Sequence, residues 1–232
     1  MIVEDFLSEH KDKTYDYPTL PAFNNDWKSA TWIHHDSHAP WLEIKGFNPP
    51  YKEMLAEAQS LKDLFVNHRD SEANFGWASL CIHGLSAYAT QDATEYGFAD
   101  SMTAPYTWTE IKEQCPITVE FFRDHFNYNN YQRLRFMLLR PGGYIMPHSD
   151  TSKSRLNTAI NISLNNPDDC VLTTTLGTVP FKNTGSIFMF NNHYTHVAYN
   201  PSNEDRFHII VHGQPNAIWN SLVTASYPKS SN

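Results

Sequence analysis

Short apolar runs separated by turn residues fill the chain after residue 130 and constrain its fold most. The runs are rich in β-branched and aromatic residues, and turn sequences such as Pro141-Gly142-Gly143 and Asn183-Thr184-Gly185 lie between them. This alternation is typical of antiparallel β-architectures. The expected strands cover residues 131–139, 158–164, 170–175, 179–181, 186–190, 195–198 and 207–212. About seven strands of this length predict a jelly roll or a small barrel.

The first 129 residues are mixed and predict helices that buttress one sheet. Apolar residues recur every three or four positions between 51 and 69, which is the pattern of an amphipathic helix of about five turns. A strand is expected at 77–82, and a second helical region is expected at 107–125, where Pro116 can begin a new helix. Residues 1–50 have no sustained period and are expected to form an irregular arm over the core.

The chain contains no repeat, low-complexity tract or obvious linker, so one domain is expected over residues 1–232. Its expected parts are an irregular arm (1–50), a helix-rich support (51–129), a β core (130–213) and a C-terminal tail (214–232). The fold class is therefore predicted to be α+β and mainly β.

Composition disfavours several classes of partner. The 17 Lys and Arg residues against 25 Asp and Glu give a net charge of −8, which repels nucleic-acid backbones, although a local basic groove stays compatible with it. No apolar run is long enough to span a membrane, and the first residues lack the features of a signal peptide, so a cytoplasmic protein is expected. The three cysteines form no CxxC pair and are expected to be reduced.

The sequence His148-Ser149-Asp150 follows an expected strand and a Pro-Gly-Gly turn. In an extended segment the first and third residues face the same side, so both side chains can converge on one cation. A third ligand is available in His196, or in the nearby His193, at the edge of a later strand. Two histidines and one carboxylate are the facial ligand set of non-haem Fe(II) oxygenases. The alternative is a turn in which His148 is merely solvated or hydrogen bonded.

Arg206 favours the metal interpretation. It follows His196 by ten residues and opens the expected strand 207–212, where its guanidinium can point inward and hold a carboxylate in a bidentate manner. An arginine at this place suits the far carboxylate of 2-oxoglutarate. A structural salt bridge is the alternative.

Strand parity extends the expected inner face, because alternate residues of a strand share one side. The side chains expected inside are Arg206, His208, Ile210 and His212; Asn157, Asn161 and Ser163; and Arg133, Arg135 and Met137. Burial of so many polar side chains costs free energy of folding unless a ligand, a metal or water supplies their hydrogen-bond or charge partners. His208, Asn157 and Arg135 are therefore candidate contacts of a cosubstrate or substrate, with a buried polar network as the alternative.

Several motifs occur in order over about residues 130–213. They are the segment 135–150 (RFMLLRPGGYIMPHSD), Arg155-Leu156-Asn157, the segment 185–190 (GSIFMF), His196-Val197-Ala198-Tyr199-Asn200, and Arg206. This set resembles the aspartyl/asparaginyl β-hydroxylase family, which also includes bacterial hydroxylases of free amino acids such as proline. The resemblance implies a double-stranded β-helix, Fe(II), 2-oxoglutarate, dioxygen and hydroxylation of an aliphatic carbon. By motif position it implies that His148, Asp150 and His196 are the catalytic metal ligands and that Arg206 binds the oxoglutarate carboxylate.

Two features of the motifs bear on the substrate and the cosubstrate. Asp150 is present, as in the free amino acid hydroxylases of this family, whereas its animal peptide hydroxylases have glycine there. The expected substrate is therefore a free amino acid or related small molecule, with a peptidyl Asp, Asn or Pro residue as the alternative. The family's second cosubstrate-binding arginine falls on Asn157, and Arg155 lies two residues earlier, so both are candidates for that contact.

Two readings from other classes remain open. One is a metal-binding β-barrel with hydrolase or isomerase activity, and the other is a non-catalytic binding module. The histidine-rich segment 34–38 is expected to be a solvated loop or a lid over the active site rather than a second metal site.

Overall fold

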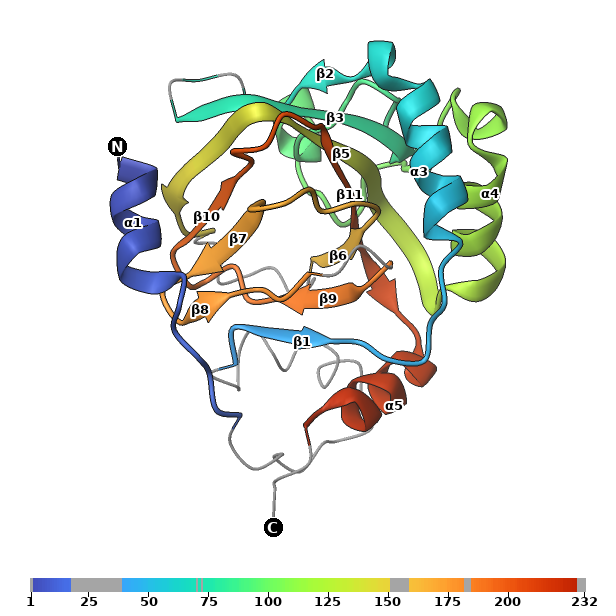
Figure 1. Cartoon of the computed structure of the whole chain (residues 1–232). Coiled ribbons are helices and arrows are strands. Elements are labelled where there is room, and N and C mark those ends of the chain that lie inside the picture. Colours follow the sequence, from blue (N-terminus) through green and yellow to red (C-terminus); the bar gives the residue numbers. More distant parts are fainter. Residues whose placement is uncertain are drawn as a thin grey trace.

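The computed structural model describes residues 2–17, 39–69, 71, 73–150, 159–181 and 185–228. Its strands form one antiparallel sheet that curls on itself, with helices outside it (Figure 1). The sheet runs in the order β1-β9-β6-β11-β5-β10-β7-β8, and β3 pairs with β5 and carries β2 and β4. The strands are β1 (Trp41–Glu43), β2 (Val66–Asn67), β3 (Asn74–Gly84), β4 (Thr107–Trp108), β5 (Tyr128–His148), β6 (Ile160–Ser163), β7 (Val171–Thr174), β8 (Gly177–Thr178), β9 (Ile187–Phe190), β10 (His196–Tyr199) and β11 (Arg206–Pro215). The predicted fold class, mainly antiparallel β with supporting helices, is confirmed.

Strand β5 belongs to both layers of the curled sheet. Its first half pairs with β11, and its last part pairs with β10. The bend between the two parts lies at Pro141-Gly142-Gly143, where Gly142 has a φ of 69° and a Cβ on Gly143 would lie only 2.7 Å from the carbonyl oxygen of Arg140. Glycine tolerates both conditions. The turn expected here is thus a bend within one strand, and the bend carries His148 into the second layer.

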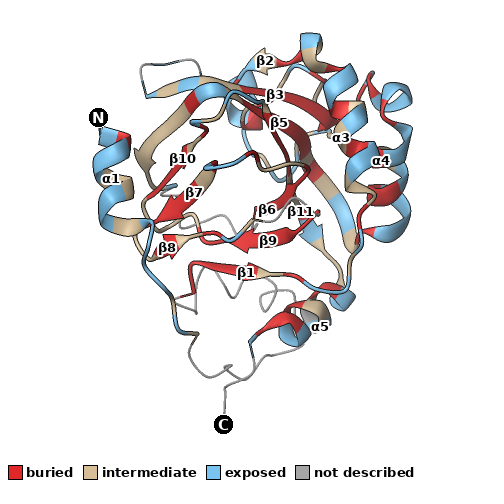
Figure 2. Ribbon diagram, in the orientation of Figure 1, coloured by how far each residue is buried: buried red, intermediate tan, exposed pale blue. Residues whose placement is uncertain are grey.

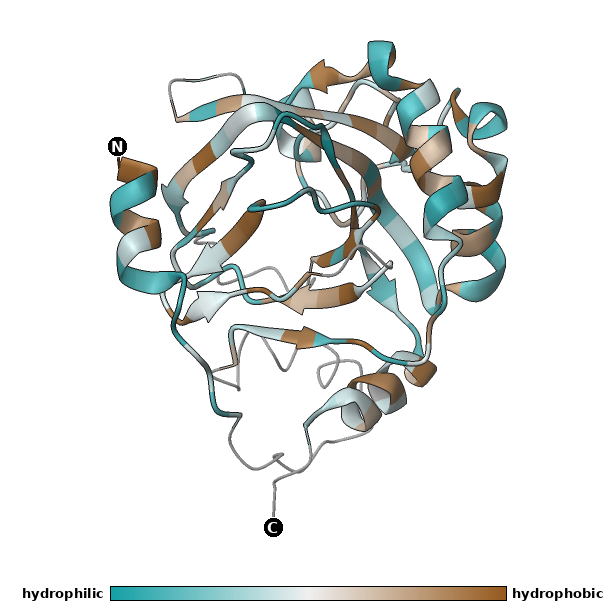
Figure 3. Ribbon diagram, in the orientation of Figure 1, coloured by the Kyte–Doolittle hydropathy of each residue, from teal (hydrophilic) through white to brown (hydrophobic). Residues whose placement is uncertain are grey.

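Several of the helices pack against the outer face of the sheet. The helical elements are α1 (Ile2–His10), α3 (Tyr51–Ser60), η2 (Lys62–Leu64), η3 (Ala93–Tyr96), η4 (Lys112–Gln114), α4 (Pro116–Glu120), η5 (Phe121–His125) and α5 (Ala217–Ser226). Alternate residues of β5, Leu134, Phe136 and Leu138, are fully buried in the core that α3, α4 and α5 share with the sheet. Figure 2 shows buried strands inside and exposed outer helix surfaces, and Figure 3 shows polar and apolar residues mixed along α3 and α4. The opposite face of β5, which includes Leu139, turns inward.

Glu57 of α3 caps the N-terminus of α4. Its Oε1 accepts a hydrogen bond from the backbone N–H of Ile117 (2.8 Å), and its Oε2 accepts from the N–H (2.9 Å) and the hydroxyl (2.6 Å) of Thr118. The capping residue of α4 itself, Cys115, makes no such side-chain bond. A carboxylate at this position satisfies free N–H groups and interacts favourably with the helix dipole. Glu57 therefore joins the two helices that support β5.

Replacing Glu57 with alanine is expected to lower the free energy of unfolding by about 1–2 kcal/mol, because the first-turn N–H groups of α4 lose their acceptor. Glu57→Gln is expected to lose less, since an amide oxygen still accepts one bond. Urea denaturation measures both, and Gln59→Ala, an exposed change on α3, serves as a control with an effect within about 0.5 kcal/mol. Equal stability of Glu57→Ala and Gln59→Ala would contradict the capping role.

Both ends of the chain hold regular structure where an arm and a tail were expected. Helix α1 buries Val3, and β1 extends the sheet by pairing with β9. Helix α5 begins after Asn216, whose Oδ1 accepts from the backbone N–H groups of Ile218 (2.9 Å) and Trp219 (3.3 Å). Short segments of this kind become regular through tertiary burial rather than intrinsic propensity, so their sequence signal is weak.

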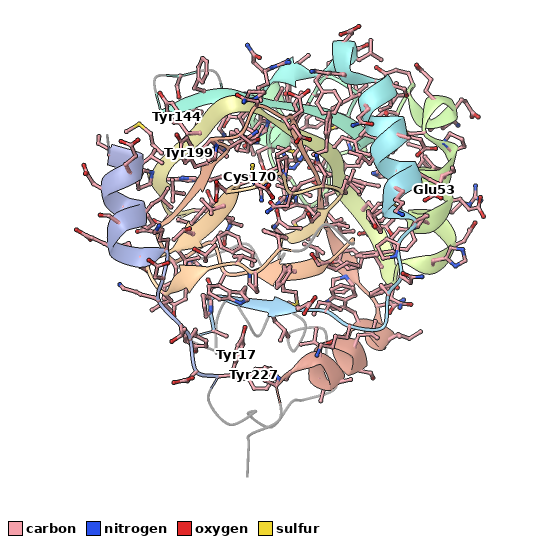
Figure 4. The ribbon with its side chains drawn as sticks, in the orientation of Figure 1. Tyr17, Glu53, Tyr144, Cys170, Tyr199 and Tyr227 are labelled. Atoms are coloured by element: carbon pink, nitrogen blue, oxygen red, sulfur yellow. The ribbon has the colours of Figure 1, made fainter. Side chains whose placement is uncertain are left out.

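The two end segments also contact each other. The hydroxyl of Tyr17 donates to the carbonyl oxygen of Trp41 (2.6 Å), and its ring meets that of Tyr227 edge to face, with the ring centroids 5.6 Å apart (Figure 4). None of the described helices is long and apolar enough to cross a membrane.

The remaining differences lie at element boundaries. The helix expected over 51–69 is shorter in the structure: α3 ends at Ser60, and the rest of the range forms η2 and β2. The strand expected at 77–82 is longer and covers all of β3. The region 107–125 starts as a strand, β4, before α4 begins at Pro116 as expected. The strand expected at 179–181 is replaced by β8, which forms a hairpin with β7 where a turn was expected. Hairpin pairing outweighs the local apolar pattern there.

Candidate active site

Two strands and one loop bring the predicted ligand residues together. His148 is the last residue of β5, His196 is the first of β10, and the two are paired across these neighbouring strands. Asp150 follows just beyond β5. One ligand atom from each of the three lies within 4.8 Å of the others, and we call these residues the His-Asp-His group. His148 and His196 are 48 residues apart in the chain, and the pairing of β5 with β10 brings them side by side.

Hydrogen bonds orient the two histidines in the same way. The Nδ1 of His148 lies 2.8 Å from the carbonyl oxygen of Met146, and the Nδ1 of His196 lies 2.9 Å from that of Tyr194. Because a carbonyl only accepts, each Nδ1 carries the proton, and each Nε2 keeps its lone pair for a metal. Both ligand nitrogens are thus assigned by the backbone.

Asn192 orients the carboxylate. Its side-chain amide donates to Oδ2 of Asp150 (2.8 Å), and its backbone carbonyl oxygen accepts a hydrogen bond from the backbone N–H of Asp150 (2.9 Å). Asp150 is exposed, while His196 is buried and meets the ring of Phe190 edge to face. Burial, with the nearby His148 in second place, lowers the pKa of His196 to about 4. His196 is therefore neutral at physiological pH, which is the form that binds metal.

Arg206 is buried beside this group without an acidic partner in the described residues. It begins β11 and is 7% exposed. Its Nε donates to Oδ1 of Asn166 (3.0 Å), and its guanidinium carbon lies 5.5 Å from the ring centre of Phe181. Its Nη2 has no hydrogen-bond partner among the residues that the structure describes. Burial lowers its pKa to about 10, so the guanidinium stays charged at neutral pH. A buried cation with a free N–H edge fits an anionic ligand.

His208 continues the same face of β11. It is 6% exposed, its ring packs edge to face on Phe181 with the centroids 4.7 Å apart, and its Nε2 has no hydrogen-bond partner in the described part of the chain. Burial and then the charge of Arg206 hold the pKa of His208 well below its usual range. Its ring is therefore neutral and offers a hydrogen bond rather than a charge.

One cavity of about 930 Å³ is lined by the His-Asp-His group, Asn192, Arg206 and His208. Residues from the three predicted inward-facing sets line it, including Arg133, Arg135 and Met137 from β5, Asn161 from β6, and Arg206, His208, Ile210 and His212 from β11. These positions face the cavity as predicted, whereas Ser163 is buried but is not part of the wall. Arg155, Asn157 and the segment 34–38 lie outside the described residues, so their expected roles stay predictions.

Residues 49–214, more than half of the chain, match the sequence model of the family described as aspartyl/asparaginyl beta-hydroxylase. The chain belongs to this family. The match extends well beyond the 130–213 segment whose motifs carry the resemblance, and it includes α3, β3 and α4. No curated protein sequence matches the chain.

Solved structures are similar to the chain at low sequence identity. One is a prolyl hydroxylase from Trichoplax adhaerens in complex with a hypoxia inducible factor oxygen degradation domain peptide fragment, with 11% identity over 87% of this chain and 92% of that chain and a TM-score of 0.52. Another is an oxidoreductase of the 2OG-Fe(II) oxygenase family from Burkholderia pseudomallei, with 9% identity over 85% and 95% and a TM-score of 0.49. The fold is the double-stranded β-helix.

Family and fold together place this β-hydroxylase homologue among the 2-oxoglutarate- and Fe(II)-dependent dioxygenases. The His-Asp-His group fits Fe(II), because two imidazole nitrogens and one carboxylate oxygen on one side leave coordination positions open. The Nη2 of Arg206, which lacks a partner in the described part of the chain, fits a carboxylate of 2-oxoglutarate. The readings as a hydrolytic barrel and as a binding module therefore lose their support.

Sequence reasoning missed Asn166, Asn192 and Phe181 as parts of the site. The two asparagines lie in turn-forming stretches, 165–168 and 191–194, and their sequence signal is indistinguishable from that of ordinary turns. Their contacts with Arg206 and Asp150 span about forty residues of chain, so only the fold reveals them.

Replacing Asn192 with alanine is expected to weaken divalent-metal binding about 10- to 100-fold, because Asp150 loses the amide that fixes its carboxylate. Mn(II) titration followed by electron paramagnetic resonance measures this. The control is His193→Ala in the same loop, a residue outside the His-Asp-His group, which is expected to keep metal affinity within a few-fold. A larger loss in His193→Ala than in Asn192→Ala would contradict the assignment.

Proposed function

We propose that the chain hydroxylates an aliphatic carbon of a free amino acid or a related small molecule, with Fe(II) at His148, Asp150 and His196 and with 2-oxoglutarate at Arg206. The observation that carries the proposal is one cavity with two features: a metal-type ligand group and a buried arginine that lacks an acidic partner among the described residues. Asp150 also supports a small substrate, since the animal peptide hydroxylases of the family have glycine at that position.

The chain's own residues bind, orient and exclude water in this proposal. Arg206 holds the far carboxylate, and Asn166 fixes the direction of the guanidinium through its Nε. The neutral ring of His208 offers a hydrogen bond to the bound cosubstrate through its Nε2. Leu139, Ile145, Leu172 and Phe190 form an apolar wall near the His-Asp-His group, which keeps water from the reacting atoms. Bound Fe(II) supplies the redox chemistry through which dioxygen and 2-oxoglutarate oxidise a C–H bond.

A second candidate substrate is a peptidyl Asp, Asn or Pro residue. It is favoured by the exposure of Asp150, which leaves the ligand group accessible from one side. Parallel assays of succinate release with free amino acids and with peptides containing the same residues separate the two. Turnover of a free amino acid is expected. Turnover confined to peptides would overturn the small-molecule assignment and leave the enzyme class in place.

We also propose that the protein works in a reducing compartment such as the cytoplasm. All three cysteines, Cys81, Cys115 and Cys170, are free and buried. Proteins of oxidising compartments are instead often held together by disulfides. Targeting of a fluorescent fusion tests this assignment, and secretion of the fusion would contradict it.

A further inference from the structure

A second arginine lies in the same cavity, in the middle of β5. Arg135 is 4% exposed and lines the cavity wall. Its Nη1 donates to the carbonyl oxygen of Thr90 (2.7 Å), while its Nε has no hydrogen-bond partner among the described residues. Burial, and then the charge of Arg133, lower its pKa to about 9, so it is still a cation at neutral pH. Such a group is costly unless an anion reaches it.

Asp92, a buried acidic side chain of the same cavity wall, already has its partners. Asp92 accepts hydrogen bonds from Ser101, from the N–H (3.2 Å) and hydroxyl (2.9 Å) of Thr94, and from Arg133 (3.4 Å). Although burial alone would raise the pKa of Asp92, these bonds hold it at about 2. No salt bridge in the described part of the chain includes Arg135.

The other titratable neighbours of Arg135 do not neutralise it. Burial, with Arg135 in second place, lowers the pKa of His68 to about 2, and burial raises the pKa of the Cys81 thiol to about 11, so both are uncharged. Arg69 adds a further positive charge at this side of the cavity. Among the described residues on this side of the cavity, the carboxylate of Asp92 is paired with Arg133, and the other carboxylate, Asp100, is exposed. The positive charge of Arg135 therefore has no salt-bridge partner there.

Arg135 is a separate binding point from Arg206. Arg206 pairs with Leu139 on β5, and Arg135 lies four residues before Leu139, which is roughly 13 Å of extended backbone. The two guanidiniums are also held by different elements, Arg206 by Asn166 in the loop after β6 and Arg135 by Thr90 in the segment after β3. A five-carbon dicarboxylate spans only about 6 Å. One cosubstrate molecule bound at Arg206 therefore leaves Arg135 available.

We propose that Arg135 binds a carboxylate of the substrate, so that the preferred substrate is a free carboxylic acid rather than an internal peptide residue. This inference rests on the proposed function and names the part of the substrate that the cavity recognises. The free Nε and the charge of the guanidinium supply a strong, directional contact for a carboxylate oxygen. Arg135 is thus a specificity-determining residue that touches substrate and not the reacting carbon.

The test is an anaerobic calorimetric titration of free amino acids into protein loaded with Mn(II) and 2-oxoglutarate. Each amino acid that binds is compared with its α-carboxamide, which removes the carboxylate and keeps the size. Amino acids with a second, side-chain carboxylate are included with their side-chain amides, so that the group held by Arg135 is identified. The acid is expected to bind about 10- to 100-fold more tightly than its amide.

The variants are Arg135→Gln, Arg135→Lys and, as a control on the same strand outside the cavity wall, Arg140→Gln. Arg135→Gln is expected to remove the preference for the acid and to leave 2-oxoglutarate affinity within a few-fold. Arg135→Lys keeps the charge and is expected to restore part of the preference. Arg140→Gln is expected to behave as wild type.

Three results would overturn the proposal. The first is a wild-type protein in which no acid binds more tightly than its amide, and the second is a preference that survives in Arg135→Gln. The third is loss of acid and amide binding together with a lowered melting temperature in both Arg135 variants, which would make Arg135 structural. Failure of the proposed function looks different, because wild-type protein would then not bind 2-oxoglutarate at all. If 2-oxoglutarate does not bind, the same titrations without Mn(II) and 2-oxoglutarate still measure whether Arg135 gives the preference for the acid over its amide.

Discussion

Replacing His148 with alanine is expected to weaken divalent-metal binding by more than about 100-fold and to abolish succinate release, while the fold survives. A lost ligand costs more than the 10- to 100-fold that loss of an outer hydrogen-bond partner costs. His148 lies at the end of β5, is only partly buried and lines the cavity rather than the helix-packed core. The free energy of unfolding without metal is therefore expected to change by about 1 kcal/mol or less.

Metal content after dialysis and urea denaturation measure these two effects. His125→Ala is a suitable control, because His125 is exposed in η5 on the helix side of the sheet and lies outside the cavity wall. The control is expected to match wild type in both measurements. A His148→Ala protein that keeps stoichiometric metal, or one that unfolds, would show that His148 has a structural role instead.

Arg206→Gln is expected to weaken 2-oxoglutarate binding by about 2–4 kcal/mol, or about 30- to 1,000-fold, because a buried carboxylate would lose its charged partner. Metal affinity is expected to stay within a few-fold of wild type, since Arg206 is outside the His-Asp-His group. Fluorescence or calorimetric titration with Mn(II) present separates the two affinities. Asn166→Ala, which removes only the acceptor of the Arg206 Nε, is expected to give a smaller loss of the same kind.

A different substitution of the same residue, Arg206→Met, gives a second prediction, which concerns stability. Without ligand, the buried guanidinium of Arg206 has no acidic partner in the described residues, and burial of such a charge opposes folding. Arg206→Met, which fills a similar volume without charge, is therefore expected to leave the ligand-free protein as stable as wild type or more so. A large loss of stability in Arg206→Met, with 2-oxoglutarate binding retained, would identify Arg206 as a structural residue.

The central part of the site could be predicted because it follows from local geometry. His148 and Asp150 are two residues apart, so an extended backbone puts them on one side. Strand parity correctly grouped His208 with Arg206, and Arg135 with Met137, as residues of one inner face, and all four line the cavity. The positions of most strands after residue 130 could also be predicted, since β-rich runs alternate with turn residues, although the strand expected at 179–181 is absent from the described structure. These predictions depend on spacing along the chain, which the sequence contains directly.

The rest depends on contacts between distant parts of the chain. No local pattern indicates that Glu57 caps α4 or that Asn192 holds Asp150. The bend of β5 was expected as a turn because Pro141-Gly142-Gly143 has turn composition, and only pairing with β11 and β10 on either side keeps it within a strand. Helix α1 and strand β1 similarly become regular through packing on the sheet.

The most direct test of the account is anaerobic calorimetric titration of 2-oxoglutarate into the protein with and without Mn(II). The His-Asp-His group and Arg206 line one cavity, so the account predicts tight binding with Mn(II), much weaker binding without it, and loss of the metal-dependent binding in both His148→Ala and Arg206→Gln. The absence of 2-oxoglutarate binding in the presence of metal, or binding that neither substitution changes, would contradict it.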